Sequence, residues 1–512
     1  MLTTCKKFDA DIVVCGGGPG GSAAAISSAR AGKRTILLEI RESLGGLCTN
    51  GYITGLAGVV DGISREWLER LDAEGHAVMQ PHLPVVEPEF GKAMLEYMAL
   101  QAGCRILYGT HVVDCVKENN KIKSVIAYCK SGKIEITGKI FIDATGDADL
   151  AFAADVPCEV GNAEFLGLNQ SVTMGFRLSY VNLKKYNEAN AEWRKHPDYD
   201  PKDLKKRSLI VYKEHQAVAS GDLHELLSPG NIVYPMPVGD PTRTDVTLDA
   251  THTFDCHNDD VVDLTRQIVD QRRKVIWFVD FLKKYVPGFE NAVLTGVASM
   301  NGVRDSRRIV GEYVLRDIDL ALAAKFDDGI YQHTEFYDTH VPTPGHHTAL
   351  RHVHYKEHVD PACCRPSQDD KDYMMHPFVG PGGYEIRTNP REYCEIPFRS
   401  LIACGVDNLM AVGRCCSAEY HALGSVRVIG PSMGMGQAAA LGAALVIDQK
   451  LDAIRELDGK LVRQAMIANG VALDKLPGGY WEHQRKLKGD LAVSCADMIE
   501  IRNKKNINYI IK

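Results

Sequence analysis

Three features are absent from this sequence of 512 residues: a long apolar run, an excess of positive charge and a cysteine framework. No run approaches the ~20 apolar residues of a membrane span. The first ten residues, MLTTCKKFDA, are too short and too polar for a secretory signal before the first strand. A formal net charge of −7 argues against nucleic acid or an anionic membrane as the main partner. We therefore expect a cytoplasmic protein without a membrane span.

Cysteine is plentiful, but its spacing is uninformative. The fifteen cysteines show no disulfide pattern, which in a large chain of this kind predicts mostly reduced thiols. Hydrophobic residues make up 45% and charged residues 24%, which is ordinary for a globular protein. The chain is long enough for two domains with a substantial core.

The most informative stretch is residues 11–39. Its apolar start, residues 11–15, predicts a buried strand, and a helix of small residues and a second strand follow. Between the first strand and the helix lies a turn with the pattern G-x-G-x-x-G: Gly16, Gly18, Pro19, Gly20 and Gly21. The first glycine allows the turn, the second lets a pyrophosphate approach, and the third lets the helix pack on the strand. Glu39 ends the second strand, where it can accept hydrogen bonds from ribose hydroxyls. This order predicts a dinucleotide site.

The position of the pattern favours FAD, because flavoproteins that hold FAD in a split domain usually begin this way. Two later segments can close such a domain. In residues 139–150 an apolar strand runs into a turn that can pass close to a ligand. The predicted contacts there are Ala144, Thr145, Gly146 and Asp147. In residues 408–445 a helix N-terminus would stabilise the negative charge of a reduced flavin. The predicted contacts there are Gly413, Arg414, Ser432, Met433, Gly434 and Gln437.

A glycine-rich loop at residues 44–58 can pass the flavin ring. Its predicted contacts are Gly45, Gly46, Leu47, Cys48 and Thr49. With these segments the chain resembles the FAD-dependent oxidoreductase family of the glutathione-reductase-type flavoprotein superfamily. Matching motifs also occur at residues 87–90, 302–313 and 396–401, so the resemblance extends from residue 9 to about 447.

The resemblance implies an α/β fold and an enzyme. The fold would be a Rossmann-like FAD-binding domain with a mostly parallel sheet and an inserted α+β substrate domain. We place the split FAD-binding domain at residues 1–151 and 394–450, the inserted domain at 152–393 and a C-terminal helical appendage at 451–512. The residue pattern predicts strands at 105–115 and 171–180, a polar loop at 187–200 and a long amphipathic helix at 260–285. The resemblance implies no substrate, because most members of the family are unassigned in activity.

Several flavoprotein mechanisms lack their residues in this chain. A dithiol mechanism would need a second cysteine near Cys48, and the adjacent pair at Cys415 could form only a strained disulfide. We interpret Cys48 and Cys415 as lining of the flavin pocket. Residues 40–58 contain no histidine for covalent attachment, so we expect FAD to be bound non-covalently. No second G-x-G-x-x-G follows a strand, so a dedicated NAD(P)H domain is not visible.

Two residues near the flavin helix are candidates for catalysis. By resemblance, His421 lies in the loop between the Gly413 turn and that helix, where a neutral-pH imidazole could act as a general base. An equally weighted alternative is that it only braces the loop. Arg427 could bind a substrate carboxylate or offset charge on reduced flavin. Its alternative is an ion pair between the domains, which is the favoured role for Arg414.

Further candidates lie in the inserted region. Arg304, Arg307 and Arg308 cluster in the segment VRDSRR, where Arg304 and Arg308 would share a face at helical spacing. One of the three could reach the site, and the favoured role of the others is pairing with a nearby acid or phosphate. Histidines crowd between His340 and His358, and we favour solvent-facing side chains over a metal site there. A middle interpretation is that His346 or His347 enters the site as an acid or base.

The sequence thus predicts an oxidoreductase that exchanges a hydride between flavin N5 and a small polar substrate between the two domains. Alternatives are an ene-reductase that saturates a C=C bond, or an electron-transfer flavoprotein without its own substrate. The electron partner stays open, and a homo-oligomer is possible. We expect no nucleic acid partner and no metal.

Overall fold

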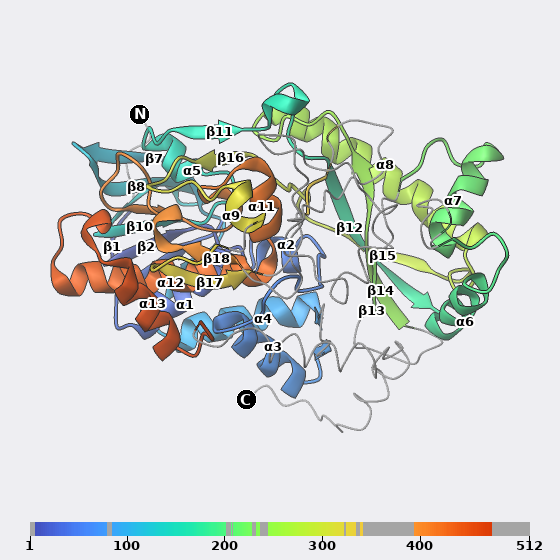
Figure 1. Ribbon diagram of the computed structural model, residues 1–512, viewed down its shortest axis with the longest axis horizontal. Coiled ribbons are helices and arrows are strands. Elements are labelled where there is room, and N and C mark those ends of the chain that lie inside the picture. The colour runs from blue at the N-terminus through green and yellow to red at the C-terminus, as the bar shows by residue number, and fades with distance from the viewer. Residues whose placement is uncertain are drawn as a thin grey trace.

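The computed structural model describes residues 6–78, 84–200, 206, 208–227, 232–235, 244–321, 324–333, 338–340, 342 and 394–473. These residues form two bodies that lie side by side (Figure 1). The body on the left of that view is built on a parallel sheet, and the body on the right on an antiparallel sheet.

The parallel sheet has five strands in the order β19-β10-β2-β3-β6, and every neighbouring pair is parallel. The strands are β2 (Ile12–Cys15), β3 (Thr35–Leu38), β6 (Arg105–Leu107), β10 (Ile140–Asp143) and β19 (Leu409–Ala411). Strands β2, β3, β10 and β19 are buried along their whole length, as expected for parallel strands covered on both faces. The predicted α/β fold with a parallel, Rossmann-type sheet is confirmed.

Helices cover this sheet. They include α1 (Pro19–Arg30), α2 (Gly46–Thr49), α3 (Ile63–Ala73), α4 (Pro88–Gln101), α12 (Ile429–Gln449) and α13 (Gly459–Ala468). Helices α1 and α12 pack so closely that a Cβ on Gly436 would lie 1.9 Å from the carbonyl oxygen of Gly20. The short residues of both helices are therefore needed for this contact, which brings two distant parts of the chain together.

Helix α12 is the one helix in the described chain that is long and apolar enough to cross a membrane by length and composition. The expectation from the sequence overlooked it because its apolar character comes largely from alanine and glycine. Of its most apolar 18 residues, 89% are buried inside the protein. Buried core helices of soluble proteins have the same composition, so this feature is weak support for a membrane span.

A second sheet packs beside the parallel one, in the order β1-β9-β8-β7. Its strands are β1 (Lys6–Asp9), β7 (His111–Glu118), β8 (Lys121–Cys129) and β9 (Gly132–Thr137). The sequence pattern predicted one strand over residues 105–115, which is wrong. The chain turns at Gly109, whose φ is +58°, so residues 105–107 join the parallel sheet instead.

The body on the right holds a sheet in the order β13-β14-β12-β15. Its strands are β12 (Val172–Val181), β13 (Ile232–Pro235), β14 (Thr244–Thr253) and β15 (Val293–Val297), and its helices are α6 (Leu183–Trp193), α7 (Leu209–Ala219) and α8 (Val261–Tyr285). The strand predicted at 171–180 and the helix predicted at 260–285 are both present. The prediction of a loop at residues 187–200 was wrong for 187–193, because α6 continues to Trp193 and buries that side chain.

Shorter elements link the two bodies or border them. They are β4 (Ala77–Val78), β5 (Val85–Val86), β11 (Cys158–Val160), β16 (Arg307–Ile309), β17 (Gly329–His333), β18 (Cys394–Pro397), α5 (Asp149–Ala153), α9 (Asp317–Ala321) and α11 (Tyr420–Val426). The prediction that Arg304 and Arg308 share a helix face was wrong, because residues 307–309 form β16, which pairs with β11.

The C-terminal part that is described packs into the main core. Val462 and Met466 of α13 are fully buried in the same hydrophobic cluster as α1 and α12. A separate cluster fills the body on the right, between its sheet and α8. Each body therefore has a hydrophobic core of its own.

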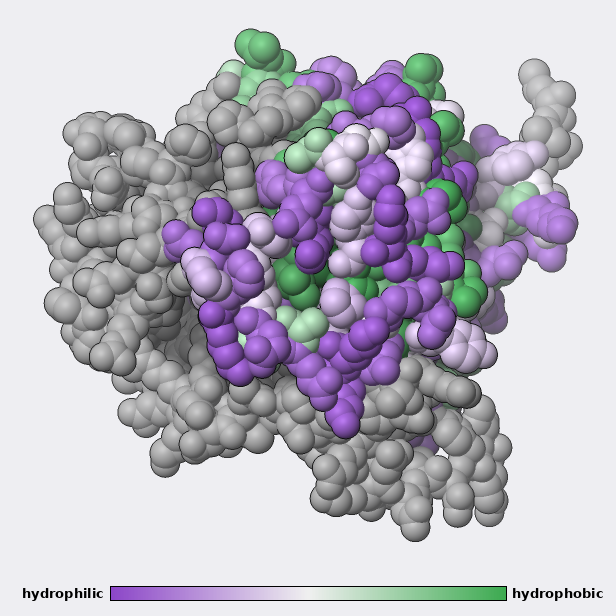
Figure 2. All heavy atoms as spheres, turned by 90° about the vertical axis from the view of Figure 1, so that its right-hand side faces the viewer, coloured by the Kyte–Doolittle hydropathy of each residue, from purple (hydrophilic) through white to green (hydrophobic). Residues whose placement is uncertain are grey.

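The face of the right-hand body that Figure 2 shows is mainly hydrophilic. Figure 2 shows that hydrophobic side chains appear there between charged and polar ones. Four of the exposed apolar side chains belong to α8: Val261, Val262, Val269 and Ile276. Charged side chains of the same helix, such as Arg272 and Arg273, are also exposed.

Candidate functional site: a dinucleotide cradle and a buried polar junction

The glycine turn joins β2 to α1, and its backbone atoms pack very closely. A Cβ on Gly21 would lie 1.8 Å from the carbonyl oxygen of Gly16, so only glycine allows this approach of helix to strand. Gly16 itself has a φ of +97°. Gly18 differs, because a Cβ there would meet no protein atom within 4 Å. The space beside Gly18 is open at the N-terminus of α1, where a pyrophosphate would bind.

Glu39 lies directly beside this turn. Its carboxylate accepts hydrogen bonds from the backbone N–H of Gly17 and, at 2.7 Å, from that of Arg41. Burial raises the pKa of Glu39, and these two bonds oppose the shift. Each carboxylate oxygen can accept a further bond, so ribose hydroxyls can be added to this arrangement.

The loop of residues 45–49 approaches the same place. A Cβ on Gly46 would lie 2.9 Å from the Cα of Gly18, so the loop lies against the turn. Gly46 and Leu47 are half-buried, whereas Gly45, Cys48 and Thr49 are buried. The Thr49 hydroxyl donates to the Leu44 carbonyl at 2.6 Å, and the Cys48 side chain has no exposed surface. Cys48 and Thr49 therefore hold the loop together from inside.

The turn after β10 is braced by a buried carboxylate that the sequence analysis missed. Asp143 accepts hydrogen bonds from Thr145 N–H at 3.0 Å, from the Thr145 hydroxyl at 2.7 Å and from Ala151 N–H at 2.8 Å. Burial raises its pKa, and these donors oppose the shift. Residues 144–147 are half-buried. The brace presents their backbone at the carboxyl end of the sheet.

Arg414 closes this turn from the other end of the chain. Its Nη1 lies 2.6 Å from Asp147 Oδ1 and donates to the Ser306 hydroxyl at 2.8 Å. Burial alone would raise the pKa of Asp147, but the charge and hydrogen bond of Arg414 bring it below its usual value. Ser306 belongs to the predicted inserted domain. The contacts among Asp147, Ser306 and Arg414 therefore connect three distant segments of the chain.

The residues predicted on α12 have mainly packing roles in the described structure. The Ser432 hydroxyl donates to the Arg427 carbonyl at 2.9 Å, and Met433 is 1% exposed. A Cβ on Gly434 would lie 2.3 Å from the Tyr331 ring. The amide oxygen of Gln437 accepts from the backbone N–H of Ile63 at 3.0 Å, so it caps α3. A Cβ built on Gly413 would lie 3.7 Å from the Ser432 hydroxyl oxygen, so Gly413 lies close to the first turn of α12.

These loops together form the dinucleotide cradle, which we define as residues 16–21, 39, 45–47, 144–147 and 413. All follow the carboxyl ends of neighbouring parallel strands or lie against them, at the edge where doubly wound sheets bind ligands. The open space beside Gly18 and the acid at Glu39 fit an FAD pyrophosphate and ribose.

The catalytic candidates meet at a second place, around Asp338, Thr339 and His340. Arg427 Nη2 donates to the Asp338 carbonyl at 2.6 Å and lies 3.1 Å from its carboxylate. His421 Nδ1 lies 3.3 Å from the Thr339 hydroxyl. A Cβ on Gly424 would lie 2.8 Å from that hydroxyl oxygen, so α11 approaches this segment closely. We call this place the polar junction.

Residues of the predicted inserted domain complete the polar junction. Arg304 donates to the Ser171 carbonyl at 2.8 Å and lies 3.6 Å from Asp249 Oδ2 on β14. Gln170 Oε1 accepts from the backbone N–H of His340 at 3.0 Å and lies 3.5 Å from Arg427. The junction is therefore built by both bodies.

Burial perturbs the charged groups of the junction. It lowers the pKa of Arg427, and the nearby Arg304 acts in the same direction, while Asp338 opposes both. Burial would raise the pKa of Asp338, but His340 and Arg427 bring it well below its usual range. The Asp338 carboxylate is therefore ionised between two cationic or proton-bearing partners.

Four buried polar atoms of the junction have no hydrogen-bond partner in the part of the chain that the structure describes. They are Gln170 Nε2, Ser171 Oγ, Asp249 Oδ1 and Arg427 Nε. Buried polar atoms are seldom left unsatisfied without a functional reason. Their donors and acceptors are of the kinds that would bind a small polar molecule. Nothing local in the sequence marks Gln170, Ser171 or Asp249 as site residues.

Part of the predicted site cannot be placed. His346 and His347 lie outside the described residues, as do the other histidines from there to His358. The prediction of a solvent-facing side chain is wrong for His340, which is 6% exposed. Within the described residues no group of three His, Cys, Asp or Glu side chains could hold a metal ion. The prediction of no metal in the histidine-rich segment stays a prediction.

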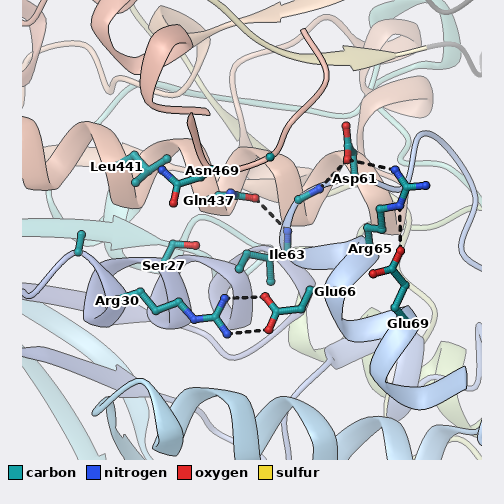
Figure 3. Close-up of a pocket in the computed structure, with 13 residues that line it drawn as sticks. Ser27, Arg30, Asp61, Ile63, Arg65, Glu66, Glu69, Gln437, Leu441 and Asn469 are labelled. Carbon is teal, nitrogen blue, oxygen red and sulfur yellow. Dashed lines mark hydrogen bonds and ion pairs between the residues drawn. The ribbon is translucent and has the colours of Figure 1, made fainter. Parts of the chain in front are cut away.

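A separate pocket of about 370 Å³ lies at the far end of α1 (Figure 3). Arg30 forms a two-pronged contact with Glu66 there, at 2.6 and 2.9 Å, and Arg65 pairs with Glu69 at 3.2 Å. The pocket borders the C-terminal turns of α1, whereas the glycine turn is at its N-terminus. It is therefore not the dinucleotide cradle.

Among curated proteins, thiamine thiazole synthase of Saccharolobus islandicus is 29% identical over 157 residues. The match covers 28% of this chain and 58% of that protein. The corresponding enzyme of Metallosphaera sedula is 29% identical over 155 residues, which are 57% of its length. The chain thus spans less than two thirds of these relatives.

Solved structures with similar folds have low identity. A geranylgeranyl bacteriochlorophyll reductase-like protein from Thermoplasma acidophilum is 13% identical, with 98% of this chain and 92% of that one covered and a TM-score of 0.43. The p-nitrophenol 4-monooxygenase of Pseudomonas putida is 9% identical, with 98% of each chain covered and a TM-score of 0.40.

A model of one family matches nearly the whole chain. It is described as FAD dependent oxidoreductase and covers residues 11–466, which include the entire dinucleotide cradle and the polar junction. This match confirms the resemblance to the FAD-dependent oxidoreductase family and the predictions of an enzyme and of FAD as its cofactor, and it does not specify the glutathione-reductase type. The chain belongs to the FAD-dependent oxidoreductase family.

Proposed function

We propose that this enzyme exchanges a hydride between flavin N5 and a small polar organic substrate that binds at the polar junction. The observation that carries the proposal is the convergence of His421 and Arg427 on residues 338–340, with Arg304 close enough to act on the charge of Asp338. The four buried polar atoms without partners support it, because a polar substrate would satisfy them.

When bound, FAD supplies the atom that accepts or gives up the hydride. The chain would hold it through the amides at the N-terminus of α1, the Glu39 carboxylate and the backbone of residues 144–147. We propose that the attachment is non-covalent, because residues 40–58 contain no histidine. The proximity of Arg427 to the first turn of α12, through the Ser432 hydroxyl, supports a junction close to the flavin ring.

Within this proposal His421 is the residue that moves a proton. It is 2% exposed, and its contact with Thr339 fixes the orientation of the ring. Arg427 is already paired with Asp338, so it positions that carboxylate and contributes its remaining donors to the substrate. Arg304 contributes in the same way, since Asp249 and the Ser171 carbonyl hold it in place.

The test is reduction of the bound flavin under anaerobic conditions by a panel of small polar alcohols, amines and acids. A general base typically contributes about 10²–10⁴-fold to a rate, so His421→Ala should slow flavin reduction by that factor while FAD stays bound. His111→Ala, at an exposed position on β7, is the matched control and should reduce at the wild-type rate.

Three results would argue against the proposal. If His421→Ala reduces at the wild-type rate, proton transfer belongs to His346 or His347. If no small donor reduces the flavin but C=C compounds reoxidise the photoreduced protein, the enzyme is an ene-reductase. If only a protein partner exchanges electrons, it is an electron-transfer flavoprotein.

A further inference from the structure

Two buried histidines from distant parts of the chain face each other beside the polar junction. His252 Nε2 lies 3.1 Å from His340 Nδ1, and the ring centroids are 5.3 Å apart. The side chains are 4% and 6% exposed. A hydrogen bond at this distance holds a single hydrogen between the two nitrogens. The two rings therefore cannot change their protonation independently.

The backbone is shaped to make this contact. Strand β14 has an irregular register opposite residues 172–174, and Thr251 within it has a φ of +75°. A bulge of this kind redirects the next side chain, which here is His252. On the other side, the backbone of His340 is held by Gln170 Oε1 at 3.0 Å.

The Asp338 carboxylate determines whether His252 Nε2 or His340 Nδ1 carries the shared hydrogen. Its Oδ1 lies 2.9 Å from His340 Nε2, and Arg427 keeps the carboxylate ionised. An ionised carboxylate only accepts hydrogen bonds, so His340 donates its Nε2 hydrogen to Asp338. His340 Nδ1 is then the acceptor, and the shared hydrogen belongs to His252.

We propose that Asp338, His340 and His252 form a buried proton store that takes up one proton when the flavin is reduced. The proton adds at His252 Nδ1, and the Nε2 hydrogen of His252 passes to His340 Nδ1. The positive charge then rests on His340, against the Asp338 carboxylate. One proton is gained from solvent and no other bond changes. The inference rests on the proposed function only for the nearness of the flavin to the polar junction.

The charges around the pair favour this exchange. Asp338, Arg427 and Arg304 act on the charge of His340, and Arg304 is paired with Asp249. On the other side, Lys274 donates to the backbone carbonyl of His252 and is paired with Asp270. Burial lowers the pKa of His340, and Arg304 acts in the same direction, whereas Asp338 opposes them. These effects favour a neutral His340 ring near neutral pH. Negative charge on the reduced flavin raises the proton affinity of the histidine pair and so favours the uptake of a proton.

The first experiment needs no substrate and no variant. Histidine labelled with ¹⁵N is followed by NMR over a pH titration of the FAD-loaded, oxidised protein. We expect His252 and His340 to titrate together as one coupled unit, with His340 protonated at Nε2 throughout. Independent titration of the two rings near pH 6.5, the ordinary value of an imidazole, would overturn the proposal.

The second experiment counts protons through the pH dependence of the flavin midpoint potential, measured against reference dyes. For a two-electron couple each proton taken up contributes about 30 mV per pH unit. We expect the slope of the wild-type protein to exceed that of His340→Gln and of His252→Gln by one proton. His76→Gln changes another buried histidine, stacked on Phe90, and should keep the wild-type slope.

Equal slopes in all four proteins would overturn the proton store, even if the two histidines titrate together. That result would leave the proposed function standing, because the substrate panel tests it separately. Conversely, a slope smaller by one proton in both His340→Gln and His252→Gln would support the proton store even if no substrate had yet been found.

Discussion

The open space beside Gly18 allows a test of FAD binding that does not disturb folding. Gly18 has φ −63° and ψ −173°, which any residue can adopt, and a Cβ there meets no protein atom within 4 Å. Gly18→Val should therefore fold, with an apoprotein stability within about 1 kcal/mol of wild type. The new side chain occupies the space of the pyrophosphate and keeps it from the amides of α1.

The expected loss follows from those amides. A hydrogen bond to a charged group contributes about 1.5–3 kcal/mol, and two lost bonds amount to about 3–6 kcal/mol. Since 1.4 kcal/mol is tenfold in affinity, FAD should bind about 10²–10⁴-fold more weakly. Titration of the apoprotein with FAD, followed by flavin fluorescence, measures this directly. Thermal unfolding without FAD measures the effect on the fold.

Gly21→Val is the matched contrast. Its Cβ would lie 1.8 Å from the Gly16 carbonyl oxygen, so it should lower the stability of the apoprotein as well. Our reasoning is refuted if Gly18→Val binds FAD within threefold of wild type, or if its apoprotein is as unstable as that of Gly21→Val.

Three further outcomes are expected. Heat or acid should release intact FAD from the denatured protein, as judged by chromatography, and flavin that stays with the chain would contradict non-covalent binding. Gln437→Ala should lower the free energy of unfolding by about 1–3 kcal/mol, because the Ile63 N–H loses its acceptor, while FAD affinity stays unchanged. Arg414→Gln should cost about 1–3 kcal/mol, a value reduced from that of a fully buried pair because Asp147 is about a third exposed. Because the pKa of Asp147 is lowered in the folded state, that difference should be constant at neutral pH and shrink as the pH falls below about 4 in denaturant titrations.

Features encoded locally could be predicted from the sequence. The glycine turn with Glu39 specifies the parallel sheet and the cradle, since each glycine meets a steric demand of its neighbours. Helix α8 was predicted to within a residue, because its apolar positions repeat with helical spacing and Asp260 caps its start. These signals lie within a few residues of what they determine.

Features set by distant partners could not be predicted. Residues 187–193 look polar, yet Trp193 stacks on Tyr212 at 4.1 Å and donates to the Lys206 carbonyl, and this contact extends α6. The segment of Arg304 has helical spacing, but Arg308 bonds to the Ala418 and Gly161 carbonyls and the chain runs as a strand.

The candidate site divides in the same way. The cradle follows from the glycine pattern and the acid, whereas the polar junction depends on residues 338–340 meeting α11 and β14. No spacing in the sequence indicates that His252 would face His340, and Gln170 has no motif around it. Only the assembled fold brings these side chains together.

The contact of Gly20 with Gly436 has a consequence for biosynthesis. The two glycines are about 400 residues apart in the sequence, yet their helices α1 and α12 pack directly against each other beside the parallel sheet. At 5–20 residues per second, the ribosome needs roughly 20–80 s to make the second helix after the first. During that time the N-terminal strands and α1 lack their cover and expose apolar surface. FAD loading and closure of this domain are therefore late events, and the nascent chain depends on protection from aggregation until then.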